Sequence, residues 1–464
     1  MTKLFSFRTL FITTTLSLSG CSLAPEYQRP DSVADPVVEL KAAHSSGRYR
    51  FQDLYRDDPA LLAILENALI NNFDLQLAMA RVESTRAQKL SSLFDLIPSL
   101  NYTASKTISM NSVSSPLTNQ TLKQRSEQYQ GRMGVDSWEV DLWGKKRNKI
   151  ASMNSSEESH RSLVANVQLT LMSDLATAWY EAHSMIQVWH ILQNKKIEMQ
   201  RIEEKLMRIN QQGRLEPIIL TKFLRGKGTD ESTTHNLEVE ILARIHQLEY
   251  LSGTVSPALN AENWQTIVSY NEAPQLMQAI RSDIILNRPD VIAAEWQIKA
   301  ANGNIGSARA ALLPGVSLFA NAWRTSSSLD GIVDSYRDNW TLTPSVMIPV
   351  FDLPKHYASL KYAETQQKMA IIDYRNTIAQ ALKEIKDATD ALRLSQGSLA
   401  VVREELKAQS VNFDNNKRRY EAGYQDLYTH YEALDIYSGV QIELESKRQL
   451  VILNSVALLK SLGG

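Results

Sequence analysis

The sequence predicts a mainly α-helical fold with a smaller β part, in which a long helical hairpin occurs twice and is accompanied by four strands. Heptad-spaced residues over 164–192 return 210 positions later over 374–402, and both series step by four and three residues. The same shift carries Gly213 onto Gly423 without a gap. Runs of alternating polarity lie before each long helical segment. A duplication of this size takes precedence over the two or three ordinary domains that 464 residues would otherwise suggest.

Composition narrows the range of partners. The chain carries 50 basic and 51 acidic side chains, so no net field favours nucleic acid or an acidic substrate, and we expect no nucleic-acid partner. Cys21 is the single cysteine, which leaves no thiol for a structural disulfide. Stability must therefore come from packing and assembly.

The first 20 residues have the features of a secretory signal. Lys3 and Arg8 precede a short apolar stretch, and small residues at 19–20 lie directly before Cys21. A lone cysteine at this place resembles a bacterial lipobox, in which the thiol is acylated and anchors the mature protein to lipid. Ser22 stands where inner-membrane lipoproteins often have Asp, which favours the outer membrane.

We therefore predict a lipoprotein signal peptide over 1–20 and an acylated N-terminal tether over 21–57. The alternative is an ordinary signal peptide with an incidental cysteine. Proline at 25, 30 and 36 predicts that the tether is extended.

The first structural repeat is predicted over 58–253. Asp58 before Pro59 marks a capped helix start, and helical spacing continues toward Asp95 until Pro98 ends it. Two alternating runs around a polar connection then predict strands at about 99–110 and 128–143. A very long helix over 145–212, a turn at Gly213 and a return helix complete the repeat.

A linker over 254–273 leads to the second structural repeat, predicted over 274–464. Asn287, Asp290 and Pro314 repeat Asn71, Asp74 and Pro98 at a shift of 216. Strands are expected at about 315–327 and 338–351, followed by a long helix over 355–422 and a return helix. At 1.5 Å per residue each long helix reaches about 100 Å. A heptad seam of this length requires partner helices.

Four strands leave the β part incomplete. Membrane barrels begin at about eight strands, and open sheet edges in lipid leave backbone groups unpaired. Three identical protomers would supply twelve strands in a closed ring. We therefore expect four transmembrane strands per protomer, completed by other copies. From periodicity alone, a small soluble sandwich on a coiled coil is the alternative.

Five runs of residues then make the chain recognisable. Together they resemble the TolC-like outer-membrane efflux family, in its NodT-type lipoprotein branch, and they lie at 138–147, 287–290, 300–310, 419–423 and 462–464. The similarity extends from the lipobox to the last residue.

This resemblance implies a homotrimer in the outer membrane of a Gram-negative bacterium, anchored through acylated Cys21 and extending into the periplasm. A twelve-stranded barrel would continue into a periplasmic tunnel of twelve helices. Such proteins are exit ducts that export small molecules such as drugs, together with a periplasmic adaptor (membrane fusion) protein and an inner-membrane pump, here of the RND type. They are not enzymes and need no cofactor. The alternatives are a duct for type I protein secretion and a lipid-anchored envelope coiled coil without a pore.

The resemblance also places the closed end of the duct at the two hairpin turns. The candidate adaptor-contact tip consists of Gly213, Arg214, Arg418, Arg419, Gly423 and Tyr424. The candidate periplasmic gate consists of Tyr428, Tyr431 and Glu432, although ordinary packing is the alternative role for Tyr424, Tyr428 and Tyr431. The chain departs from the family pattern at Thr429, where Asp is common, and at Pro217, in a turn without an acidic residue.

No pattern predicts catalysis or a metal site. His183 and His190 lie seven residues apart, without a nearby cysteine or clustered carboxylate, so we expect packing or surface roles. The run at 226–229 lacks the leading glycine and the strand of a phosphate loop, and we interpret it as a weak point in the return helix.

Overall fold

The computed structural model describes residues 22–30, 58–114, 121–267, 282–330 and 339–463. The predicted signal peptide, Cys21 and most of the predicted tether lie outside these residues. The chain forms two compact units, each assembled from three separate segments. Of the described residues, the strand unit contains 22–30 and those within 81–160 and 293–374, and the hairpin unit contains 58–80 and those within 161–292 and 375–463. Each unit takes a part from each predicted repeat.

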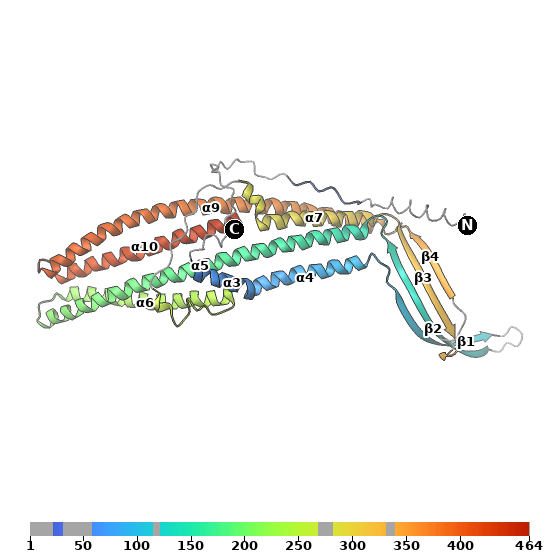
Figure 1. Cartoon of the computed structure of the whole chain (residues 1–464), viewed down its shortest axis with the longest axis horizontal. Helices are drawn as coiled ribbons and strands as arrows, with labels where there is room; N and C mark the ends of the chain where they lie inside the picture. The colour runs from blue at the N-terminus through green and yellow to red at the C-terminus, as the bar shows by residue number, and fades with distance from the viewer. Residues whose placement is uncertain (1–21, 31–57, 115–120, 268–281, 331–338, 464) are drawn as a thin grey trace. The chain divides into compact units, whose positions relative to one another are not determined.

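Seven α-helices and four strands make up the described chain, with two short 3-10 turns at Trp264–Thr266 and Ser282–Asn287 (Figure 1). The helices are α3 (Pro59–Asn71), α4 (Phe73–Phe94), α5 (Lys145–Gln211), α6 (Pro217–Ser252), α7 (Pro289–Ala310), α9 (Leu353–Glu421) and α10 (Leu427–Leu462). The strands are β1 (Asn101–Ser114), β2 (Thr121–Val140), β3 (Gly315–Ser326) and β4 (Asn339–Met347). The predicted fold of long duplicated helices with four strands is therefore confirmed for one chain. Within the described ranges, no helix combines the length and apolarity needed to cross a membrane.

The helix predicted from Asp58 toward Asp95 is in fact two helices. Asp58 caps α3 as expected, because its side chain accepts a hydrogen bond from the backbone of Leu61 at 3.1 Å. Asn72 has an extended backbone and separates α3 from α4. Its side chain accepts from Leu75 N at 3.0 Å and donates to Leu251 O at 2.9 Å. An asparagine side chain that competes for backbone groups explains this break, which helical spacing alone does not reveal.

The four strands form one antiparallel sheet in the order β1-β2-β3-β4. The two predicted hairpins join through β2 and β3, whose pairing shifts register between Val135 and Trp138. The first hairpin is longer than predicted, because its polar arms pair as far as Ser114 with Thr121. Cross-strand polar contacts such as Ser109 with Ser126 at 2.6 Å support this part, which lacks a clear apolar face.

Two predicted strand ends are corrected. Strand β4 stops at Met347 instead of 351, because Pro349 has no N–H for the ladder. Strand β2 stops at Val140 instead of 143, because Asp141 caps the next helix. The Asp141 carboxylate accepts from the backbone N–H of Lys146 at 2.9 Å and of Arg147 at 3.1 Å.

The N-terminal segment 22–30 lies against α5 and α7 within the strand unit. Ser22 Oγ donates to Asn148 Oδ1 at 2.7 Å, and Arg29 pairs with Glu295 at 2.7 Å. Gly306 allows close approach, since a Cβ there would lie 2.8 Å from the backbone of Ala24. A glycine in the last turns of α7 thus makes room for the backbone of segment 22–30.

Candidate functional site

The two hairpin turns, which carry most of the predicted site residues, have the same backbone geometry. Gly213 has φ of 68° and Gly423 has φ of 79°, a region that favours glycine. Arg214 N donates to Ile209 O at 3.2 Å, and Tyr424 N donates to Arg419 O at 2.8 Å. Both turns are therefore Schellman-type helix ends 210 residues apart, which is the geometry that the duplicated glycines predict.

The ends of both return helices repeat this relationship. Gly253 closes α6 with φ of 70°, and Gly463 closes α10 with φ of 89°. The end of α10 is held by Arg288, whose guanidinium donates to Ser461 O at 2.6 Å and pairs with Asp290 at 2.7 Å. A Cβ added at Gly463 would lie 3.2 Å from Cγ of Arg288, so two of the five recognisable runs, 287–290 and 462–464, lie against each other.

The starts of the two return helices differ. Asp426 caps α10, because its carboxylate accepts from the backbone N–H of Thr429 at 2.9 Å and from the Thr429 hydroxyl at 2.6 Å. These two hydrogen bonds hold the pKa of Asp426 below its ordinary value. Pro217 begins α6, and Glu216 before it makes no side-chain cap. Thr429, a departure from the family pattern, is therefore part of a helix cap.

The candidate adaptor-contact tip is exposed. Tyr424 is 81% exposed, and a Cβ added at Gly213 or Gly423 would meet nothing within 4 Å. Arg214, Arg418 and Arg419 are also exposed. The tip therefore offers aromatic, cationic and bare backbone groups to the surroundings.

An apolar cluster behind the tips joins all four long helices of the hairpin unit. Met199, Ile202 and Leu206 come from α5, Phe223 from α6, and Leu427, Tyr431 and Leu434 from α10, while Phe413 and Tyr420 of α9 pack against them. The Tyr431 ring meets Phe223 at a centroid distance of 5.1 Å in an edge arrangement. Burial raises the pKa of Tyr431 to about 12.

The structure separates the three candidate gate residues. Tyr431 is buried inside the hairpin unit, in the packing role that was its alternative, whereas Glu432 is exposed and Tyr428 is half-buried. Burial and a hydrogen bond to Glu432 raise the pKa of the Tyr428 hydroxyl. Tyr428 and Glu432 therefore act as one pair on the surface of α10.

The run at 226–229, interpreted from the sequence as a weak point in the return helix, lies within α6, which continues through it without a break. Gly226 lies under the Tyr431 hydroxyl, and any Cβ at this position would collide with it. Lys227 pairs with Glu203 of α5 at 2.8 Å. The glycine therefore makes room for the Tyr431 hydroxyl.

Sequence reasoning missed a buried cation between the hairpins. Lys195 of α5 is 5% exposed and pairs with Asp230 of α6 at 2.7 Å and Asp435 of α10 at 2.6 Å. Although burial alone would lower its pKa, the two carboxylates raise it, so the ammonium stays charged. No local spacing marks residues so distant in sequence.

An aromatic stack between α9 and α10 was also missed, although a signal existed. Tyr420 lies over His430 at 4.7 Å and 2°, His430 faces Phe413 at 5.8 Å and 16°, and Phe413 lies over Tyr437 at 5.0 Å and 3°. Each helix contributes two rings seven residues apart, which is a heptad spacing. In the first hairpin, the positions that correspond to Phe413 and Tyr437 at the 210 shift are Glu203 and Lys227, which form an ion pair instead.

The two histidines that the sequence analysis considered, His183 and His190, make hydrogen bonds to backbone carbonyl groups. The His183 ring contacts Trp179 and bonds to its backbone O at 2.9 Å, and His190 bonds to Ile267 O at 2.8 Å. No group of three potential metal-ligating side chains exists in the part of the chain that the structure describes.

Comparison with known proteins gives consistent matches. The family model of the outer membrane efflux protein matches residues 64–212 and 280–464. The solvent efflux pump outer membrane protein SrpC of Pseudomonas putida is 29% identical, with 99% of this chain and 98% of SrpC covered. The cation efflux system protein CusC of Escherichia coli K12 is 26% identical, with 97% of each chain covered. The CmeC outer membrane channel of Campylobacter jejuni has the same fold, at a TM-score of 0.84 and 20% identity over 96% of this chain and 95% of CmeC.

Duplicated helical hairpins and a four-stranded sheet, together with the match to the family model, thus define a subunit of an outer-membrane channel. The chain belongs to the outer membrane efflux protein family. It is an outer-membrane efflux channel protein of a Gram-negative bacterium, and the predicted resemblance is confirmed. The family is one of channels and not of enzymes.

Proposed function

We propose that this chain is the exit duct of a tripartite efflux pump, in which three copies form one channel that exports small molecules. The observation that carries the proposal is the sheet, whose outer strands β1 and β4 each pair on one side only within the described chain. In lipid, each unpaired backbone group costs several kcal/mol. A second and third copy of the sheet would pair these edges, and twelve strands would close the ring.

The faces of β4 support a place in lipid. Trp340, Leu342 and Val346 alternate with Thr341 and Thr343, and all three apolar side chains are more than half exposed in the single chain. Alternation of apolar and polar side chains is typical of strands with one face on lipid and the other on a water-filled lumen. Apolar side chains on the helices, such as Leu394 at 64% and Val401 at 68% exposure on α9, offer further surface for neighbouring copies.

Anchoring by an acylated Cys21 is part of the same proposal. Segment 22–30 is seated on α5 and α7, and Ser22, which follows Cys21 in the sequence, donates a hydrogen bond to Asn148 near the start of α5. Two or more acyl chains give stable attachment to a membrane. The predicted limits of the signal peptide, the tether, the linker and the two repeats belong to this proposal too.

The exposed tip is the surface that we assign to the periplasmic adaptor. Gly213 and Gly423 let another backbone approach closely, and Arg214, Arg418 and Arg419 supply cations for carboxylates of a partner. The adaptor would in turn connect the duct to an inner-membrane pump of the RND type.

For the gate, the burial of Tyr431 favours different roles for the three candidate residues. Tyr428 and Glu432 would face the channel axis, where three copies of the pair converge, while Tyr431 supports α10 from inside the protomer. Rings of polar side chains at an axis constrict channels. The relatives are named for solvent and cation efflux, which favours small cargo of varied chemistry.

The trimer is tested by disulfide cross-linking between the sheet edges. Thr103→Cys on β1 is combined with Thr341→Cys or Thr343→Cys on β4, and each single variant is the control. The double variants should give covalent trimers on oxidation in membranes, and purified trimers should conduct ions in planar bilayers. Deletion of the gene should raise dye and drug accumulation in cells. A monomer that neither cross-links between strands nor conducts would overturn the proposal.

A further inference from the structure

The first strand hairpin extends beyond the rest of the sheet. The pairing of β2 with β3 ends at Tyr129 and Ser326, whereas the pairing of β1 with β2 continues to Ser114. β1 and β2 therefore continue past the ends of β3 and β4, on the side away from the strand ends that lead into the helices (Figure 1). We call residues 106–112 of β1 and 123–129 of β2 the outer hairpin.

The register of the sheet fixes which side chains share a face. All four strands are crossed by one row of directly paired residues, Trp340, Ala322, Met133 and Tyr102. Directly paired residues point to the same side of an antiparallel sheet, and so does every second residue along a strand. The even-numbered residues of β1 therefore share the face of Trp340, which the proposed trimer turns toward lipid.

The two faces of the outer hairpin differ in charge. The face shared with Trp340 carries Lys106, Ile108, Met110 and Ser112 of β1 and their partners Tyr129, Glu127, Arg125 and Lys123 of β2. The opposite face carries uncharged polar side chains, which are Thr107, Ser109, Asn111, Gln124, Ser126 and Gln128. The charge of the outer hairpin is therefore concentrated on the lipid side.

The cations begin where the apolar part of this face ends. On β3, Val316 pairs with Val346, and Ser326, ten residues later, pairs with Tyr129. At a rise of about 3.3 Å per residue and a strand tilt of about 40°, this length spans about 25 Å of height, the size of the apolar band of a membrane barrel. Tyr129 and its partner Lys106 therefore lie at a headgroup level, where aromatic girdles occur. Because the helices of this family extend into the periplasm, this is the level of the outer leaflet.

One carboxylate serves two of the three cations on this face. Glu127 pairs with Lys106 at 2.9 Å and with Arg125 at 2.6 Å. The Lys106 ammonium also lies 5.0 Å from the centre of the Tyr129 ring. The side chains of Lys106 and Arg125 remain 41% and 60% exposed, and Lys123 is exposed on the same face. Glu127 and Tyr129 thus position cations whose charge exceeds that of the carboxylate.

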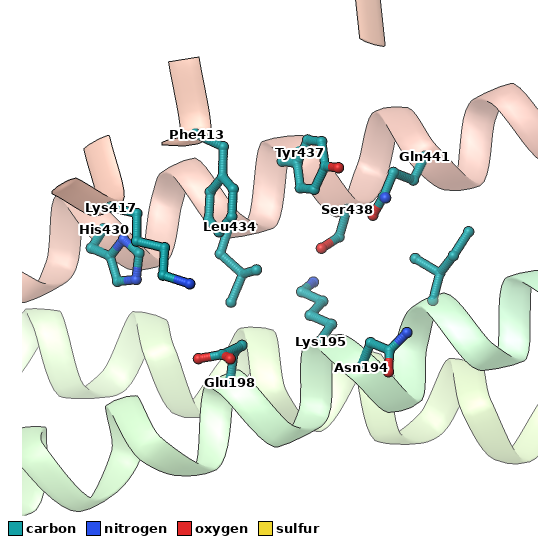
Figure 2. A pocket seen from close by; sticks show the side chains of 11 residues that line it. Asn194, Lys195, Glu198, Phe413, Lys417, His430, Leu434, Tyr437, Ser438 and Gln441 are labelled. Atoms are coloured by element: carbon teal, nitrogen blue, oxygen red, sulfur yellow. The ribbon is translucent and has the colours of Figure 1, made fainter. Parts of the chain in front are cut away.

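A polar recess in the hairpin unit, between α5 and the pair formed by α9 and α10, has the opposite balance. Figure 2 shows Lys195 and Glu198 of α5 and Lys417 of α9 around this recess. Lys195 pairs with two carboxylates, Asp230 at 2.7 Å and Asp435 at 2.6 Å. In the outer hairpin one carboxylate faces three cations, an excess that an anion from outside the chain can neutralise.

We propose that the outer hairpin binds phosphate groups of lipid A, the bisphosphorylated glycolipid of the outer leaflet, from the lipid side of the barrel. Lys106, Lys123 and Arg125 donate to the phosphate oxygens, and the planar guanidinium of Arg125 suits a bidentate contact. Ile108 and Met110 are 55% and 61% exposed between these cations and offer apolar surface to the same lipid. The inference rests on the proposed trimer for the side of the sheet that faces lipid.

Binding is measured by native mass spectrometry of the purified full chain in detergent, with EDTA present so that no divalent cation bridges acidic groups. Bisphosphoryl lipid A should bind saturably, and monophosphoryl lipid A about fivefold more weakly, as expected for one lost contact between a phosphate and a cation. Inorganic phosphate at equal concentration should leave bound lipid A in place. Equal binding of the two lipids, no saturable binding, or displacement by inorganic phosphate would contradict the proposal.

Lys106→Gln combined with Arg125→Gln should weaken bisphosphoryl lipid A about tenfold, because two of the three cations are lost. The matched control is Lys383→Gln combined with Lys407→Gln on α9, since these side chains are 75% and 72% exposed and also pair with nearby carboxylates. The control should bind lipid A like wild type. The same spectra record the trimer, so a hairpin variant that loses its trimer but keeps lipid A would assign the cations to contacts between copies and refute the proposal.

The face is tested in outer membranes with Ile108→Cys and Ser109→Cys, neighbouring positions on opposite faces of the hairpin. Each variant is labelled with a benzophenone maleimide, and labelled wild type gives the background. Illumination should attach the glycolipid at residue 108 and not at residue 109, whereas equal attachment at both positions would refute the assigned face. Conductance is recorded for the purified trimers as well. A conducting trimer that does not bind lipid A overturns this inference alone, whereas a chain that forms no conducting trimer overturns the proposed duct.

Discussion

The hydroxyl of Tyr431 on α10 lies directly over the backbone of Gly226 on α6, so that a Cβ at residue 226 would force the Tyr431 side chain to shift. Two residues further on, Gly228 has nothing within 4 Å of its Cβ direction. One helix therefore contains two glycines with opposite requirements.

Gly226→Ala should lower the free energy of unfolding by about 1–3 kcal/mol, because the new methyl group overpacks the contact with Tyr431. Gly228→Ala is the matched control and should raise it by about 0.5–1 kcal/mol through helix propensity. Tyr431→Phe removes the colliding oxygen, so it should rescue most of the loss in the double variant. Thermal unfolding of the purified protein checks this, and equal effects of the two glycine variants would contradict it.

Asp426→Ala should lower stability by about 1 kcal/mol at pH 7, as is usual for loss of a helix N-cap. The depressed pKa of Asp426 means that this contribution is present above the pKa of the unfolded chain, which is close to 3.8, and is lost as pH falls through the lower pKa of the folded protein. The difference between wild type and variant should therefore shrink below about pH 4. Glu216→Ala at the start of α6 is the control, since Glu216 makes no cap bond. A pH-independent difference would speak against the cap as its cause.

Lys195→Met should destabilise the hairpin unit by about 2 kcal/mol, because it leaves Asp230 and Asp435 facing each other without a cation. The value is below that of a fully buried pair, since the Asp435 side chain is 53% exposed and partly screened. Lys383→Met is the control, because the Lys383–Asp387 pair is exposed on both sides and should change stability by less than about 0.5 kcal/mol. Denaturant unfolding followed by circular dichroism measures both variants, and similar losses would refute the role of the buried triad.

Gly306→Val should displace segment 22–30 from α7, because a side chain there meets the backbone of Ala24. Chymotrypsin should then cut after Tyr27 several times faster than in wild type. Gly397→Val on α9 is the control, since nothing lies within 4 Å of its Cβ direction. Unchanged cleavage would show that the segment is held without the glycine.

Local signals made most of the architecture predictable. The cap at Asp58, the turns at Gly213 and Gly423 and the positions of the four strands all follow from residues next to one another in sequence. The duplication then allowed the elements of the second half to be predicted from those of the first. The break at Asn72 was not predicted, because the Asn72 side chain donates a hydrogen bond to the backbone O of Leu251, which is 179 positions away in the sequence.

The contacts of the candidate site were harder to predict from the sequence, because they too join residues that are distant along the chain. The partners of Lys195 lie on two other helices, and the burial of Tyr431 depends on a glycine 205 residues earlier in the chain. Such contacts depend on how helices pack, which heptad spacing restricts but does not determine. The stack of Phe413, Tyr420, His430 and Tyr437 is intermediate, because its seven-residue spacing is visible while its partner helix is not.

At positions related by the shift of 210 residues, the two hairpins contain different kinds of cross-helix contact. Glu203 and Lys227 form an ion pair with an N–O distance of 2.8 Å, whereas the rings of Phe413 and Tyr437 stack with their centroids 5.0 Å apart. Dissolved ions weaken the first attraction and leave the second nearly untouched. A rise in salt concentration should therefore weaken this contact between α5 and α6 and leave the matching contact between α9 and α10 nearly unchanged, so that the two duplicated hairpins respond differently to ionic strength.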